Sequence, residues 1–103
     1  MEPASPSFST QRYSAKKMRK PVNFVCWAPQ ATSVCLVGDF NEWDTRAHPM
    51  LRQPDGAWLI QVPLHHGHHQ YRFMVDGKPE LDPRASGVAR NRAGERVSLM
   101  AVS

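Results

Sequence analysis

Turn-forming residues divide the chain into short apolar segments. Beyond residue 20, stretches rich in β-branched and aromatic side chains alternate with turns that contain Pro or Gly. No long amphipathic stretch with a helical period separates them, so parallel βαβ units are excluded. This spacing predicts an all-β sandwich of antiparallel strands. The predicted strands are residues 22–28, 33–38, 57–62, 69–76 and 97–102.

Apolar and polar side chains alternate within two of these strands. Because successive side chains of a strand point to opposite faces of the sheet, one set is expected to face the core and the other the surface. The inward set is Val34, Leu36, Tyr71, Phe73 and Val75, and the outward set is Cys35, Val37, Arg72, Met74 and Asp76.

The positive charge is concentrated at the start of the chain. The formal net charge is +4, and the first 20 residues hold five of the 13 basic residues but one of the nine acidic ones. The other 83 residues are formally neutral with interleaved charges, which argues against a surface that reads nucleic acid. Residues 1–20 lack apolar periodicity and are rich in Ser, Pro and Lys, so we expect a flexible, disordered basic arm. One folded domain, residues 21–103, is expected after it.

The chain shows no signal for a membrane or for secretion. Every apolar run is much shorter than the roughly 20 residues that span a bilayer. The start lacks a basic region followed by an apolar stretch, so we expect a cytoplasmic protein. In that compartment Cys26 and Cys35 are expected to be reduced thiols, although they lie in consecutive predicted strands and can face each other across a hairpin.

No residue pattern predicts catalysis or a metal site. A nucleophile beside a base and a glycine-rich phosphate loop are both missing, and the acidic residues of 38–44 do not have EF-hand spacing. Histidines 65, 66, 68 and 69 are possible ligands for Zn²⁺, Ni²⁺ or Cu²⁺. Side chains in a tight turn alternate in direction, however, and three of them converge poorly on one ion. We therefore expect a protein that is not an enzyme and holds no metal or other cofactor.

Three tryptophans point to a binding surface instead. Trp27 and Trp58 lie within predicted strands and are expected to pack in the core or on a sheet surface. Trp43 lies in a loop beside Asn41. An indole offered to solvent can stack on the apolar face of a sugar ring while nearby polar groups bond the hydroxyls. Trp43 is therefore the best candidate for an exposed sugar-stacking platform.

Four motifs occur in order: G-D-F-N-E-W at 38–43, D-G-A-W at 55–58, H-Q-Y-R-F-M-V-D-G at 69–77 and D-P at 82–83. Together they closely resemble the glycogen-binding domain, carbohydrate-binding module family 48. That family occurs in β subunits of AMP-activated kinase and at the N-terminus of isoamylases and branching enzymes. The likeness covers about residues 21–102. It implies an immunoglobulin-like, early-set β-sandwich with a non-catalytic role, either binding α-1,4-linked glucan or packing against a partner domain.

The resemblance also implies site residues. Trp43 falls on the family's first sugar-stacking tryptophan, and Arg72 on its sugar-contacting basic residue. Asn41 and Lys78 are further polar candidates for contacts with glycogen, starch or a maltooligosaccharide.

Two positions depart from the family pattern. Pro79 stands where the family carries a second tryptophan, and Val97 where it carries a sugar-bonding asparagine. Valine cannot bond a hydroxyl, although Glu95 and other polar neighbours can compensate locally. The alternative function is a protein-interaction or scaffold domain of the same fold that has lost sugar binding. Such a domain would use a sheet face or edge to pair with another protein or with itself.

Overall fold

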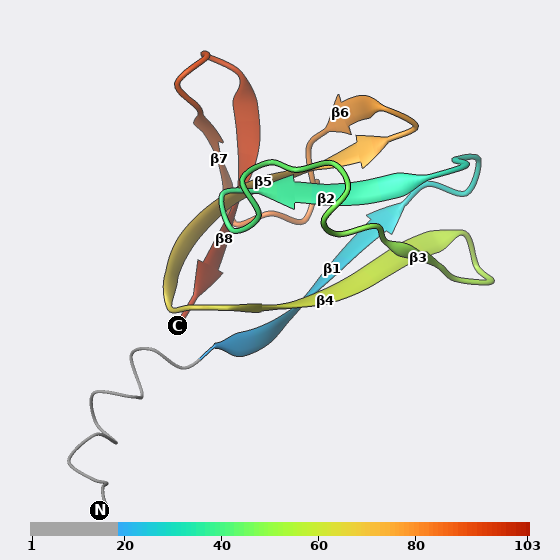
Figure 1. The fold of residues 1–103 in the computed structure, drawn as a ribbon, viewed down its shortest axis with the longest axis horizontal. Coiled ribbons are helices and arrows are strands. Elements are labelled where there is room, and N and C mark those ends of the chain that lie inside the picture. The colour runs from blue at the N-terminus through green and yellow to red at the C-terminus, as the bar shows by residue number, and fades with distance from the viewer. Residues whose placement is uncertain (1–18) are drawn as a thin grey trace, which may run out of the picture.

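Two antiparallel sheets face each other in the computed structural model, which describes residues 19–103 (Figure 1). Over that range no helix is present, and so none is long and apolar enough to cross a membrane. The predicted all-β antiparallel sandwich is confirmed. The predicted flexible arm lies outside the described residues except at its end, where the first strand, β1 (Lys20–Trp27), begins.

The smaller sheet has three strands. Its central strand is β4 (Ala57–Leu64), which pairs with β1 along eight residues and with β3 (Leu51–Arg52) on its other side. β1 is therefore an edge strand, paired on one side only.

The larger sheet has five strands, and β5 (Gly67–Val75) is the strand on which it is organised. β2 (Val34–Gly38) pairs with one side of β5. On the other side, β8 (Arg96–Val102) pairs with the first half of β5, and β6 (Lys78–Glu80) with the second half. β7 (Gly87–Arg90) extends the sheet beyond β8.

All five predicted strands are present, as β1, β2, β4, β5 and β8. The sequence pattern does not predict β3, β6 and β7, which have two, three and four residues. These short strands are mostly exposed, so they carry little of the inward and outward alternation that identifies a strand.

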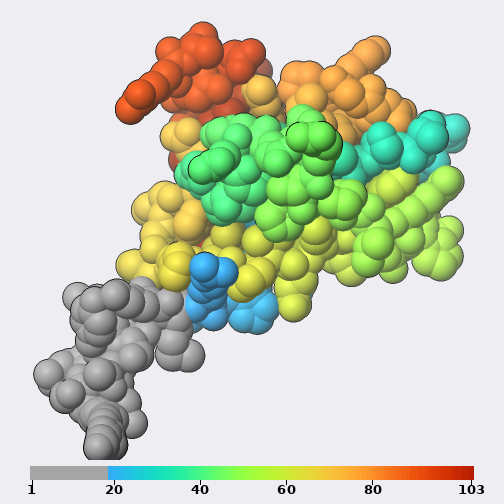
Figure 2. Space-filling view, in the orientation of Figure 1, coloured from blue at the N-terminus to red at the C-terminus, as the bar shows by residue number. Residues whose placement is uncertain are grey.

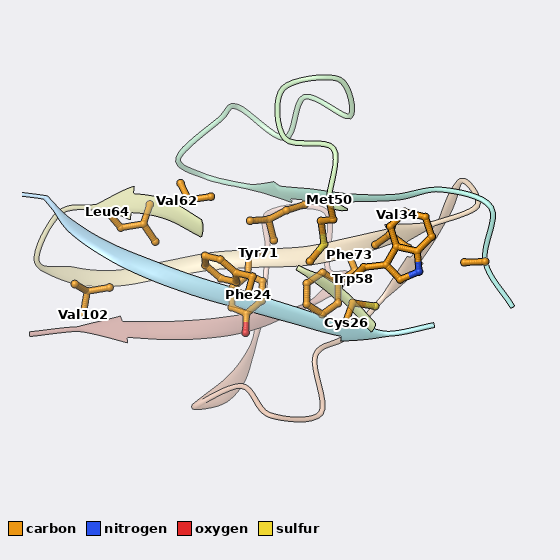
Figure 3. Packing of buried hydrophobic residues seen from close by; sticks show 12 residues of the cluster. Phe24, Cys26, Val34, Met50, Trp58, Val62, Leu64, Tyr71, Phe73 and Val102 are labelled. Carbon is orange, nitrogen blue, oxygen red and sulfur yellow. The ribbon is translucent and has the colours of Figure 1, made fainter. Parts of the chain in front are cut away.

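Aromatic rings packed between the two sheets form the centre of the core (Figure 3). Phe24 of β1 meets Tyr71 of β5 edge-on, with ring centroids 4.9 Å apart, and Tyr71 meets Phe73 at 6.0 Å. All three side chains are at most 1% exposed. The predicted inward set lines this core, except that Val75 is only half-buried.

The prediction that Val37 lies at the surface is wrong. Its side chain is only 2% exposed, yet it is absent from the core cluster between the sheets. Val37 pairs with Arg72 in the register of β2 and β5, which places both on the outer face of the larger sheet. The outer face therefore has a small buried layer of its own.

Cys26 and Cys35 do not face each other across a hairpin, because β1 and β2 belong to different sheets. Both are free thiols. Burial, together with the nearby carboxylates of Asp82 and Glu80, raises the pKa of the Cys26 thiol.

A buried polar network fixes the chain after β6 to the core. The Tyr71 hydroxyl donates a hydrogen bond to Asp82 Oδ2 at 2.6 Å, and the backbone N–H of Asp82 donates to Ser98 Oγ at 2.8 Å. Tyr71 and Ser98 are fully buried and Asp82 nearly so. Burial and the hydrogen bond to the Asp82 carboxylate raise the pKa of Tyr71 above its ordinary range.

The turn between β5 and β6 explains the Asp-Gly pair of the third motif. Asp76 and Gly77 both have positive φ, 50° and 83°, as a type I′ hairpin turn requires. Asp76 Oδ1 also accepts hydrogen bonds from the backbone N–H groups of Thr32 and Ser33. One aspartate therefore closes a hairpin and holds the loop that precedes β2.

We predict that Tyr71→Phe lowers the free energy of unfolding by about 1–3 kcal/mol. The substitution keeps the ring packing but leaves Asp82 Oδ2 without its hydrogen-bond donor. Urea denaturation followed by tryptophan fluorescence measures the change. A variant as stable as the parent would show that this hydrogen bond adds nothing to stability.

A second prediction follows from the raised pKa of Tyr71. Because the folded state favours the neutral phenol, the stability that Tyr71 contributes is fully present below the pKa of an unfolded tyrosine, about 10, and is lost as pH rises beyond it. The difference in unfolding free energy between the parent and Tyr71→Phe should be constant from pH 7 to 9 and shrink above about pH 10. A difference that grows in alkali would contradict the assignment.

Candidate functional site

The loop after β2 is folded around Gly38. A side chain at this position would place Cβ 2.5 Å from the Phe40 ring and 2.7 Å from the Gln70 carbonyl oxygen, so only glycine fits. The Gly38 carbonyl accepts hydrogen bonds from the backbone N–H groups of Asn41, at 3.2 Å, and Trp43, at 2.9 Å. The loop thereby turns back on itself and carries Trp43 over the end of β2.

The Asn41 side chain clamps this turn. Its Oδ1 accepts a hydrogen bond from the Gly38 N–H at 3.0 Å, and its Nδ2 donates to the Leu36 carbonyl at 3.0 Å. Nδ2 also lies 2.8 Å from His48 Nδ1, which must accept because the amide nitrogen is a donor. Both ends of the amide are thus engaged within the loop.

The two residues between Gly38 and Asn41 attach the loop to the body of the fold. Asp39 exchanges backbone N–H and carboxylate hydrogen bonds with Gln70 of β5, each 3.0 Å long. The Phe40 ring packs 6.0 Å from Phe24 of the core. Each residue of the G-D-F-N motif therefore has a structural contact of its own, and all of them support the tryptophan that follows.

Backbone strain is concentrated at the tip of this loop. Glu42 and Trp43 both have left-handed φ, 57° and 58°. Residues other than glycine rarely adopt this conformation, which is disfavoured by about 1–3 kcal/mol and persists where surrounding contacts enforce it. Strained positions of this kind cluster at ligand sites, so the loop tip is the first candidate for a functional site.

The structure brings Trp43 and Arg72 together. The Arg72 guanidinium carbon lies 5.7 Å from the centroid of the Trp43 ring, within the range of a cation–π contact. Its Nη1 donates to Glu95 Oε1 at 3.3 Å. The Nε of Arg72 is buried and has no hydrogen-bond partner among residues 19–103. Trp43 is half-buried. The two residues that the family resemblance singled out therefore lie in contact with each other.

Two buried valines flank the stem of Arg72. Val37 pairs with it from β2, and the register of β5 with β8 places Val97 at the neighbouring position on the other side. Val37 is 2% exposed and Val97 is 0% exposed, although both lie outside the core cluster. Packing thus restricts the guanidinium to a small region above the sheet.

A tight turn between β7 and β8 holds Glu95 beside Arg72. The Asn91 Oδ1 accepts hydrogen bonds from the backbone N–H groups of Ala93 and Glu95, and Gly94 has a φ of 82°. The Asn91 amide also lies 3.4 Å from Glu95 Oε1. Asn91 and Gly94 therefore fix the position of a carboxylate that the sequence pattern did not single out as a contact of Arg72.

These elements border a cleft of about 220 Å³. In Figure 2 the loop that carries Trp43 (green) shares a face of the molecule with the β7–β8 hairpin (red) and β6 (orange). Pro79 pairs with Met74, which places it on the same outer face as Arg72. The cleft is lined by Arg72, Pro79, Glu80, Leu81, Glu95 and Arg96.

Lys78 and Asn41, also singled out from the sequence, lie apart from this cleft. Lys78 pairs with Val75 and so belongs to the opposite face of the sheet from Arg72. Asn41 supports the loop beneath Trp43 through the contacts described above.

The other two tryptophans have different surroundings. Trp58 is 6% exposed and donates its indole N–H to the Ala28 carbonyl at 2.9 Å, so it belongs to the core as expected. Trp27 is 66% exposed. Because Cys26 faces the core, the next residue of the strand, Trp27, must face outward, so alternation along β1 predicts this exposure.

Of the histidines, His48 and His69 contact the loop that carries Trp43. His69 Nδ1 lies 3.5 Å from Asp39 Oδ1, and its Nε2 lies 2.9 Å from the His65 carbonyl. His48 and His69 both meet the Phe40 ring edge-on. Within residues 19–103, no group of three or more His, Cys, Asp or Glu side chains is arranged to hold a metal ion.

Comparison with known families gives one match. The family described as carbohydrate-binding module 48 (isoamylase N-terminal domain) matches residues 11–90. The match includes Trp43, Arg72 and Pro79 and ends before Glu95 and Val97.

Several relatives are bacterial proteins named as 1,4-alpha-glucan branching enzymes. The chain is 46% identical over 70 residues, 65% of its length, to GlgB 1 of Xanthomonas axonopodis pv. citri. It is 47% identical over 57 residues to GlgB of Novosphingobium aromaticivorans and 51% identical over 55 residues to GlgB of Burkholderia pseudomallei, which are 54% and 52% of this chain. The matched region is only 8–10% of each relative's length.

We predict that Asn41→Ala lowers the free energy of unfolding by about 1–3 kcal/mol, because it leaves the Leu36 carbonyl and the Gly38 N–H without their partners. Thr45→Ala, an exposed change in the same loop, is the control and should have little effect. Urea denaturation measures both. Equal stability of the two variants would rule out the amide clamp as the support of the loop.

Proposed function

The chain belongs to the carbohydrate-binding module 48 family, and from this membership we propose that it binds α-1,4-linked glucan on Trp43 and in the cleft lined by Arg72, without catalysing a reaction. Suitable ligands are glycogen, starch and maltooligosaccharides. The relatives are named for 1,4-alpha-glucan, which supports a ligand of this class. Since the chain spans about a tenth of those relatives, their enzymatic activity is not carried over to it.

The observation that carries this proposal is the meeting of Trp43, Arg72 and Glu95. An indole can stack on the apolar face of a glucose ring. A guanidinium donates hydrogen bonds and a carboxylate accepts them, so the pair is suited to sugar hydroxyls, which do both. Three segments far apart in the sequence supply these three groups.

The packing around Arg72 supports binding by a prearranged site. Its stem is flanked by Val37 and Val97, and its Nη1 is paired with Glu95. A side chain already held in place loses less conformational entropy when a ligand binds.

Pro79 and Val97 are expected to weaken the interaction. Their effect is judged against the family pattern, which has a tryptophan and an asparagine at these two positions. Pro79 lines the cleft but offers no aromatic face. Val97 is fully buried and cannot reach a hydroxyl. If a stacking contact and a neutral hydrogen bond are each worth about 1 kcal/mol, their loss weakens affinity by roughly tenfold or more.

We predict that calorimetric titration with maltoheptaose gives saturable heat with the parent protein and at least about tenfold weaker binding with Trp43→Ala. Leu51→Ala is the matched control, because Leu51 is a 68% exposed apolar residue on the other sheet. It should bind as the parent does. Both variants are first compared with the parent by thermal unfolding.

The alternative is a protein-interaction domain of the same fold. It is supported by the replacement of both family contacts, at Pro79 and Val97, and by the unpaired edge of β1. No heat from a folded parent up to millimolar maltoheptaose would overturn glucan binding and favour this alternative.

A further inference from the structure

A second and larger cleft, of about 880 Å³, opens between the two sheets on the side of β1. Its inner wall is apolar and includes Cys26 and Phe73, which lie together at one end of the core (Figure 3). Its outer wall is formed by the end of β6 and the residues that follow it, 80–84. The cleft therefore lies between an edge of the smaller sheet and an edge of the larger one.

Trp27 stands at the mouth of this cleft. Its side chain is 66% exposed, although burying an indole is strongly favourable. The ring lies against the turn before β4, since a Cβ added at Gly56 would be 3.4 Å from its Cη2. Gly56 has a φ of 94° and lies close to Pro29 as well, so the turn before β4 supports one edge of the indole. A supported but exposed indole is a platform for a flat apolar face.

Polar groups surround that platform. Asp55, Glu80 and Arg84 line the cleft and are exposed. Asp55 Oδ1 accepts the Ala57 N–H, while no hydrogen bond or ion pair between described residues uses the side chains of Glu80 or Arg84. The two carboxylates can accept hydrogen bonds and the guanidinium can donate them. Together with the aromatic face beside them, these groups match the mixed apolar and hydroxyl surface of a sugar.

The two clefts share lining residues. Glu80 and Leu81 line both the Trp27 cleft and the cleft beside Arg72. β6 presents Pro79 on the outer face with Arg72, and its register places Glu80 on the opposite face with Phe73. A polymer that passes over the end of β6 can contact both clefts.

We propose that the Trp27 cleft is a second subsite for the same α-glucan chain, with Trp27 as its stacking residue. This inference rests on the proposed function. A short oligosaccharide occupies Trp43 and the cleft beside Arg72 alone. A long chain continues past Leu81 to Trp27. Two linked contacts raise the affinity for the long chain without altering either contact.

The test compares maltotriose with short-chain amylose on four folded proteins: the parent, Trp27→Ala, Trp43→Ala and Leu51→Ala. Trp27→Ala should weaken amylose binding at least about fivefold and leave maltotriose binding within about twofold of the parent. Trp43→Ala should weaken both, and Leu51→Ala neither. Trp27→Phe, which keeps an aromatic face, should retain most of the amylose affinity.

A second measurement reports on the residue itself. In nitrogen-15 spectra, the indole N–H signal of Trp27, identified by its loss in Trp27→Phe, should shift with amylose and stay unchanged with maltotriose. Amylose binding equal in Trp27→Ala and Leu51→Ala would overturn the second subsite while leaving the Trp43 site intact. A parent that binds neither sugar would overturn both.

Discussion

The packing of Tyr71 is the constraint on which the rest of the structure depends. Its ring meets Phe24 of the opposite sheet at 4.9 Å, which joins the two layers, and its hydroxyl bonds Asp82, which fixes the chain after β6. Because side chains alternate along a strand, burying Tyr71 forces its neighbour Arg72 onto the outer face. The same residue also pairs with Gly38 and Ser98, so β2 and β8 are placed around it. The core and the candidate site are thus set by one strand.

The outer face of the larger sheet, like the core, contains fully buried side chains. Val37 and Val97 are buried there without belonging to the core, and Arg72 lies between them. The guanidinium then meets Trp43 from one loop and Glu95 from another. Such an arrangement leaves a charged group and an aromatic ring partly exposed, and packing restricts the movement of both. It also explains how Val97 can replace a polar residue: its side chain is part of the packing beneath the site.

The sequence pattern predicted the strands that bury a face and missed those that do not. β1, β2, β4, β5 and β8 have apolar residues at alternate positions, whereas β6 and β7 are short and mostly exposed. The error at Val37 has a physical cause: periodicity assigns each residue to a face, but it does not reveal which strand is the neighbour or what covers that face. Alternation along β1 predicts that Trp27 is exposed, but not that it lies beside a cleft, because the cleft is formed with residues far away in the sequence.

By itself, the sequence determined the class of fold, the family and the turns. The Asp76-Gly77 pair has the positive φ values that a tight hairpin needs, which is a local requirement written into residue type. Only the tertiary structure decided that Trp43 meets Arg72, that Glu95 pairs with the same guanidinium, and that Lys78 lies on the opposite face. These contacts join residues from separate strands and loops. They depend on strand register and on the direction of each side chain. Burial of the shared core sets both, and the spacing of residues along the chain does not encode them.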